Sequence, residues 1–267
     1  MRDILLIKQD SIAVVSLNRP EARNALTLNM WRELASIFSS FTDDDDVRAI
    51  VLTSWGTDFC VGADVSEFDR ISENRDQSAA YEVSVEACSA AIANLAKPVI
   101  AAVSGYCLGS GCHLALACDF RFADHTAKFG IPYAKLSSVY GAKSIQRLLA
   151  IVGITNAKRM LYSSEQYDAA RSQSMGLVDE ICDDAILAAV LFAGNLTYND
   201  PLSIEGAKFM LNGLSMGDGG LDVATAQRMI DLAGNSEDFR KAGSHSPRRE
   251  RLGSVGARSC ASSEERR

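Results

Sequence analysis

The sequence predicts an α/β protein whose C-terminal third is mostly helical. Short apolar runs, such as residues 99–103, alternate with longer segments of helical periodicity, as in folds where helices cover a sheet. From residue 142 onward the pattern becomes mainly helical. We expect a core domain over residues 1–195, a helical region over 196–242 and an atypical tail over 243–267.

A hairpin and an amphipathic helix are expected first. Residues 4–8 and 12–17 are alternating runs that flank the polar turn Gln9-Asp10-Ser11. Thr27 can cap a helix, because its hydroxyl can accept a hydrogen bond from the first turn. The apolar side chains of this helix recur at helical spacing: Leu28, Trp31, Leu34, Ile37, Phe38 and Phe41.

Two buried strands in the middle of the chain each lead into a loop that contains glycine. Residues 49–53 precede the loop 56–64. A long helix over 79–96 precedes the apolar strand 99–103, which runs into a glycine-rich loop over 105–111. Helix is expected behind that loop, from Leu114 to Ala117, and short strands at 120–123 and 127–129.

Glycine-rich turns before a helix expose backbone N–H groups, and the helix dipole favours negative charge there. Taken alone, Gly109-Ser110-Gly111 could cradle a phosphate or merely allow close packing. Two such loops, however, could direct two N–H groups at a single oxygen.

Composition excludes several classes of protein. The chain has 267 residues, with 27 basic and 34 acidic side chains and a net charge of −7, so no basic face is expected for nucleic acid. The seven cysteines show no zinc-type spacing. No secretory leader is visible and no apolar run reaches the roughly 18 residues of a membrane span, so we expect a cytoplasmic protein.

The tail over 243–267 is a break in composition. It holds six Arg and six Ser with few apolar residues, and therefore buries too little surface to offset the entropy of ordering. We expect this tail to be disordered rather than to bind nucleic acid.

Over residues 3–242 the sequence resembles the crotonase, or enoyl-CoA hydratase/isomerase, superfamily. Residues 17–26 resemble its N-terminal signature, residues 59–64 its first oxyanion loop and residues 97–119 its second. Shorter matches follow at Gln146-Arg147-Leu148, Val152-Gly153, Gly176-Leu177-Val178 and Pro201-Leu202.

The resemblance implies a crotonase-like spiral of ββα units with a C-terminal helical region, assembled as homotrimers or dimers of trimers. It implies no prosthetic group, with coenzyme A bound as part of the thioester substrate. Two backbone N–H groups polarise the thioester carbonyl in this family, and they map onto Ala63 and Ser110. Most members have glycine at the second position, where this chain has Ser110.

The coenzyme A-binding segment of the family maps onto the first signature and the first oxyanion loop. The matching residues are Ala22, Arg23, Ala25, Asp64 and Val65. Arg23 could face the phosphates of coenzyme A, or it could be a solvated surface charge.

The chain departs from the hydratase pattern at both glutamates that usually form the acid/base pair. These positions are occupied by His113 and Tyr133. His113, with an ordinary pKa of about 6.5, could carry a proton, or it could be a packed histidine bonded to backbone. Tyr133 is expected to form a pocket wall rather than to act as an acid, because a phenol has a pKa of about 10.

Tyr140 resembles in placement a tyrosine of decarboxylating members related to methylmalonyl-CoA decarboxylase. In those members the phenol lies near the carboxylate that is lost. The alternative is a core tyrosine whose hydroxyl donates to a backbone carbonyl.

Three functions remain open from the sequence. The first is an acyl-CoA-transforming enzyme of the hydratase/isomerase family that stabilises a thioester enolate, with ordinary hydratase activity in doubt. The second is a decarboxylase or hydrolase on the same scaffold. The third is a non-catalytic acyl-CoA binding protein, and a purely structural role is the most distant alternative.

Overall fold

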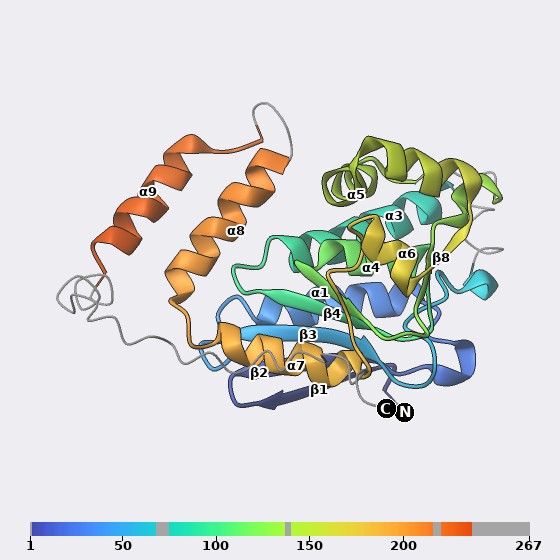
Figure 1. Ribbon diagram of the computed structural model, residues 1–267, viewed down its shortest axis with the longest axis horizontal. Helices are drawn as coiled ribbons and strands as arrows, with labels where there is room; N and C mark the ends of the chain where they lie inside the picture. Colours follow the sequence, from blue (N-terminus) through green and yellow to red (C-terminus); the bar gives the residue numbers. More distant parts are fainter. Residues whose placement is uncertain (1, 68–74, 137–139, 216–219, 237–267) are drawn as a thin grey trace, which may run out of the picture.

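A mostly parallel sheet forms the centre of the computed structural model, which describes residues 2–67, 75–136, 140–215 and 220–236 (Figure 1). Within these residues the strand order is β1-β2-β3-β4-β6-β9, and only the β1–β2 pair is antiparallel. The strands are β1 Ile4–Gln9, β2 Ile12–Leu17, β3 Ala49–Ser54, β4 Val99–Val103, β6 Phe120–Ala123 and β9 Glu180–Ile181. The mixed α/β class expected from the sequence is confirmed.

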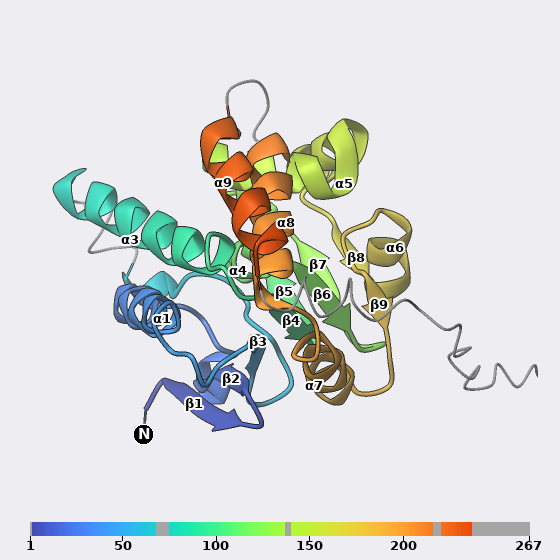
Figure 2. The ribbon, with the colours of Figure 1, turned by 90° about the vertical axis from the view of Figure 1, so that its left-hand side faces the viewer.

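Alternating side chains of the sheet pack on two different layers. On one face, residues such as Val51 and Ile100 contact the alanines of helix α7, Ala185–Leu196. On the other face, residues such as Leu52 and Ala101 belong to a larger core with helices α1, Leu28–Ser40, and α3, Arg75–Ala93. Figure 2 shows α7 on one side of the sheet and α1 and α3 on the other.

Local signals placed the first elements correctly. The predicted hairpin is β1–β2, and Thr27 Oγ1 accepts a hydrogen bond from the N–H of Met30 at 3.2 Å, as expected for the cap of α1. The predicted long helix is α3, but it begins at Arg75 and ends at Ala93 rather than covering 79–96.

The glycine-rich loop contains a strand that the sequence did not predict. Tyr106–Leu108 forms β5, which pairs with β7, Lys128–Gly130, and β7 pairs with β8, Gln166–Asp168. Helix α4 also begins earlier than expected, spanning Ser110–Ala117. The expected strand over 127–129 is β7, one residue later.

The remaining helices lie at several points along the chain, most of them after β7. They are η1 Pro20–Ala22, η2 Pro132–Ala134, α5 Ala142–Ser163, α6 Ala169–Ser174, α8 Pro201–Ser215 and α9 Val223–Gly234. Helix α5 is interrupted at Gly153, whose φ is +70°. Helices α8 and α9 pack on each other and extend away from the sheets (Figure 1), after the end of α7 near the predicted division at residue 195.

The last two points concern the C-terminal tail and membrane-spanning helices. The tail over 243–267 lies outside the described residues. Among the helices that the structure describes, none is long and apolar enough to cross a membrane.

Candidate active site

The first glycine-containing loop pairs with β5, and this pairing joins the two loops predicted to carry the chemistry. The N–H of Cys60 donates to the carbonyl of Tyr106 at 2.9 Å, and the N–H of Leu108 donates to the carbonyl of Cys60 at 2.9 Å. Gly111 is required for this approach, because a Cβ there would lie 2.4 Å from the Cys60 carbonyl oxygen. Helix α4 therefore begins directly beside the first loop.

The two predicted oxyanion donors lie on this junction. Leu26 pairs with Ala63, and the neighbouring N–H of Asp64 donates to the carbonyl of Leu26 at 2.9 Å. Gly62 lies between the loops, since a Cβ on it would be 4.0 Å from Ser110 N. Within the described residues neither Ala63 N–H nor Ser110 N–H donates to a protein acceptor. Both N–H groups are therefore left without an acceptor in this part of the chain.

The side chain of Ser110, which replaces the usual glycine of the family, is directed to Tyr133. The Ser110 and Tyr133 side chains are hydrogen-bonded, and Tyr133 lies in η2. Burial raises the pKa of Tyr133 above its ordinary value, although the Ser110 bond opposes that shift. Tyr133 is thus a protonated phenol at neutral pH, next to one of the two predicted oxyanion donors.

His113 is held between two serines from different helices. Its Nδ1 lies 2.6 Å from Ser144 Oγ on α5, and its Nε2 is hydrogen-bonded to Ser89 Oγ on α3. Burial, with a smaller contribution from the charge of Arg147, lowers the pKa of His113 to about 3. The ring is therefore neutral at physiological pH. Serine hydroxyls, rather than the backbone groups considered from the sequence, bind it.

Tyr140 packs against both of these aromatic residues. Its ring centroid lies 4.9 Å from that of Tyr133 and 6.0 Å from that of His113. Only 4 % of Tyr140 is exposed, and its hydroxyl has no hydrogen-bond partner among the described residues. Burial raises its pKa well above the ordinary value. Tyr140 is a core residue, but no described backbone carbonyl is the partner that was expected for its hydroxyl.

The five residues predicted to bind coenzyme A lie on two segments that the structure brings together. Arg19 links them, because its Nη1 donates to the Ala25 carbonyl at 2.8 Å and to Asp64 Oδ2 at 3.0 Å. Ala22 ends η1 next to Arg23, and Val65 is 75 % exposed beside Asp64. Arg19 was not predicted as a site residue, although it lies within residues 17–26, which resemble the N-terminal signature of the family.

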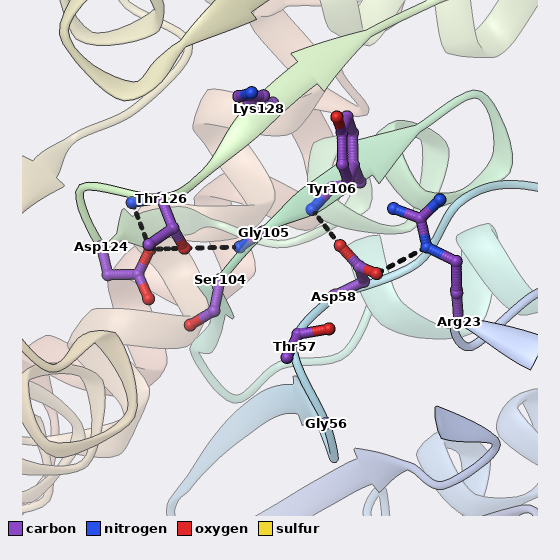
Figure 3. A pocket seen from close by; sticks show the side chains of 10 residues that line it. All are labelled: Arg23, Gly56, Thr57, Asp58, Ser104, Gly105, Tyr106, Asp124, Thr126 and Lys128. Carbon is purple, nitrogen blue, oxygen red and sulfur yellow. Dashed lines mark hydrogen bonds and ion pairs between the residues drawn. The ribbon is translucent and has the colours of Figure 1, made fainter. Parts of the chain in front are cut away.

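Arg23 lies at the edge of a polar pocket of about 640 Å³ (Figure 3). Its Nε donates to Asp58 Oδ2 at 2.7 Å, and its guanidinium lies 4.7 Å from the centroid of the Tyr106 ring. Lys128 Nζ lies 5.4 Å from the same centroid. Burial would raise the pKa of Asp58, but hydrogen bonds from Arg23 and from Tyr106 N–H lower it. The guanidinium is thus oriented by a buried carboxylate while half of its side chain stays exposed.

The described residues offer neither a cluster of metal ligands nor, at Cys60, an ionised thiol. In the described ranges, no three His, Cys, Asp or Glu residues gather in a way that could hold a metal ion. Burial raises the pKa of Cys60, the cysteine of the first loop, to about 12. That thiol is protonated at neutral pH and packs as a small apolar side chain.

Ser89 and Ser144, the partners of His113, were missed by reasoning from the sequence. They lie 24 residues before and 31 residues after His113 on separate helices. Nothing in the local sequence of either serine indicates this role. Only the fold brings them to the same ring.

Comparisons with known proteins identify the family of the chain. The family model described as "Enoyl-CoA hydratase/isomerase" matches residues 7–244. The short-chain-enoyl-CoA hydratase of Clostridium acetobutylicum is 32% identical over 215 residues, covering 79% of this chain and 82% of that protein. The 2,3-dehydroadipyl-CoA hydratase of Escherichia coli is 33% identical over 210 residues, covering 78% and 81%.

Solved structures show the same relationship. An enoyl-CoA hydratase/carnithine racemase from Magnetospirillum magneticum superposes with a TM-score of 0.85 at 28% sequence identity, and the match covers 91% of this chain and 92% of that one. Both the family model and the relatives span most of the chain. The chain therefore belongs to the enoyl-CoA hydratase/isomerase family and has the crotonase fold.

Proposed function

We propose that the protein transforms acyl-CoA thioesters by stabilising an oxyanion between Ala63 N–H and Ser110 N–H. The observation that carries this proposal is that both N–H donors lack an acceptor within the described ranges and lie on loops joined at Cys60 and Gly111. When an enolate forms at the α-carbon, the negative charge moves to the thioester oxygen. Two fixed N–H donors and the N-terminus of α4 stabilise that charge without reorganising.

Coenzyme A would lie along the segments that Arg19 joins. Arg23 is the cation for its phosphates: Asp58 holds Nε, and no described residue bonds the two terminal nitrogens of the guanidinium. Ala22 and Ala25 offer small side chains and nearby backbone, and the exposed Val65 offers an apolar contact. This arrangement supports the phosphate-facing alternative for Arg23 over a merely solvated charge.

Side chains at the two glutamate positions of the family are poor proton acceptors here. His113 is neutral with a pKa of about 3, and burial keeps Tyr133 protonated. In an acyl-CoA that carries a carboxylate on its α-carbon, loss of carbon dioxide leaves the electron pair of the broken C–C bond on that carbon and needs no base to form the enolate. This favours decarboxylation as the second candidate reaction, with Tyr140 as a hydrogen-bond donor.

A thioester panel distinguishes these functions. The protein would be incubated with crotonyl-CoA, a 3-enoyl-CoA, methylmalonyl-CoA and a saturated acyl-CoA, and the products followed by mass. We expect turnover of at least one thioester, and a rise in Tm with CoA thioesters that the free acids do not produce. Binding without any turnover would support a non-catalytic acyl-CoA binding protein. Equal stabilisation by free acids would contradict thioester recognition altogether.

A further inference from the structure

We propose that Arg147 and Tyr140 bind a carboxylate carried by the acyl group, so that the preferred substrates are thioesters of dicarboxylic acids. This inference rests on the proposed function, because it concerns the acyl end of the same thioester. It starts from buried polar atoms that lack hydrogen bonds.

Three such atoms lie on side chains that gather near His113. They are Tyr140 Oη, Arg147 Nη1 and Glu86 Oε1, the last of which is ion-paired with Lys143 although it forms no hydrogen bond; a fourth, Ser164 Oγ, lies just beyond the end of α5. A buried polar atom without a partner costs about 1–3 kcal/mol, so native proteins rarely leave several together. Two of the three atoms, on Tyr140 and Arg147, are hydrogen-bond donors.

The positions of Arg147 and Tyr140 follow from contacts with His113. Ser144 bonds Nδ1 of His113, and Arg147 lies three residues further along α5, on the same helical face. The Tyr140 ring packs edge-on against His113 from the chain just before α5. The charge of Arg147 is near enough to oppose ionisation of His113 and to favour ionisation of Tyr140. The side chains of Tyr140 and Arg147 therefore both lie near His113.

Charged side chains of both signs surround these donors, and the charge of Glu82 also acts on the nearby Tyr133. Glu86 Oε1 lies 3.1 Å from Lys143 Nζ and 3.9 Å from Arg147 Nη2, so one carboxylate faces two cations. His113 and Tyr140 are neutral. A ligand carboxylate would accept from Arg147 Nη1 and Tyr140 Oη, and bonds of this charge-assisted kind are the stronger ones.

Tyr133 connects the predicted oxyanion hole to Tyr140. Ser110 supplies one hole donor and its side chain bonds Tyr133, whose ring contacts Tyr140. An acyl chain that leaves the hole along Tyr133 would reach Tyr140 and Arg147 with its distal end. The chain length of the diacid is therefore a measurable consequence.

The test compares dissociation constants by calorimetry for butyryl-CoA, succinyl-CoA, glutaryl-CoA, adipyl-CoA and the ω-methyl ester of the best diacid. We expect one diacid length to bind about tenfold tighter than its ester, which corresponds to about 1.4 kcal/mol. Arg147→Met and Tyr140→Phe should each reduce this preference. Arg159→Leu, which removes an exposed arginine from the same helix, should retain it.

The acid-to-ester comparison needs only the wild-type protein, so it stands even if Arg147→Met fails to fold. Equal affinity for every diacid and its ester would overturn the inference and would leave a bound water as the partner of these atoms. Failure of butyryl-CoA and all diacyl thioesters to bind would instead overturn the proposed function.

Discussion

Nδ1 of His113 lies 2.6 Å from Ser144 Oγ, and this bond ties the start of α4 to α5. With Ser89 on the opposite nitrogen, both ring atoms have partners. A neutral imidazole has one donor and one acceptor, so one serine hydroxyl donates to the ring and the other accepts from it. This arrangement suits a positioning residue better than a base, since a base needs a nitrogen free to receive a proton.

The first prediction concerns the pH dependence of stability. The pKa of His113 is about 3 in the folded protein and about 6.5 when unfolded, so the unfolded state binds the extra proton between these values. The neutral ring therefore makes its full contribution to the free energy of unfolding above about pH 6.5. This contribution is lost as pH falls towards 3, at up to about 1.4 kcal/mol per pH unit.

This dependence can be assigned to His113 by substitution. The free energy of unfolding should fall more steeply from pH 7 to 4.5 in the wild type than in His113→Gln, which cannot titrate. Taking the difference between the two proteins removes the contributions of other groups, such as the buried Asp119. Parallel pH profiles would show that His113 titrates near its ordinary value in the folded state.

The features predicted well from the sequence are those determined locally. The β1–β2 hairpin and the cap at Thr27 depend on neighbouring residues, and the family motifs located the two loops. The strands β5, β8 and β9 were missed because each has only two or three residues, and partners distant along the chain define them.

The environment of the site was harder to predict for the same reason. The sequence identified His113, Tyr133 and Tyr140 through their motif positions but could not identify their partners. Ser89 and Ser144 reach His113 from separate helices, and the Tyr140 hydroxyl lacks the expected backbone partner. Whether a side chain is bonded, neutral or unsatisfied depends on tertiary packing, which local patterns do not encode.

The second prediction removes one oxyanion donor, together with the Ser110 hydroxyl that bonds Tyr133. Ser110 is the first residue of α4, a position where proline is tolerated because its missing N–H has no helical partner. Ser110→Pro should lower kcat by about 10²- to 10³-fold on any thioester that is turned over. Circular dichroism would check that α4 and the fold are retained.

The matched control is Ser110→Ala, which keeps the N–H and loses only the hydroxyl bonded to Tyr133. It should retain most of the activity. If the alanine variant is as impaired as the proline variant, the hydroxyl and not the backbone donor carries the effect.

The third prediction tests Arg23 as a phosphate contact. Arg23→Gln should weaken binding of an acyl-CoA by roughly threefold to tenfold, as expected for one charge-assisted contact at a half-exposed site, and should leave binding of the corresponding acyl-pantetheine unchanged. Calorimetry at two salt concentrations would measure both ligands. Equal losses for the two ligands would mean that Arg23 acts on loop structure, through Asp58, and not on phosphate.

The last prediction concerns hydration. A positioned acid or base commonly contributes about 10²- to 10⁴-fold, so with His113 and Tyr133 at both glutamate positions the wild type should hydrate crotonyl-CoA far more slowly than a hydratase with both carboxylates. The His113→Glu and Tyr133→Glu double variant should gain activity by at least about tenfold. Each single variant should gain little, since hydration needs an acid and a base together. At position 113 the new carboxyl would lie between Ser89 and Ser144, where burial should raise its pKa and help it to hold a proton.

The control is the double variant with glutamine at both positions. Glutamine has the same length as glutamate without an ionisable group, so this variant separates acid/base chemistry from a change in shape. An equal gain in the glutamine pair, measured by loss of the enoyl absorbance, would assign the effect to shape, and fast hydration by the wild type would show that other residues carry the protons.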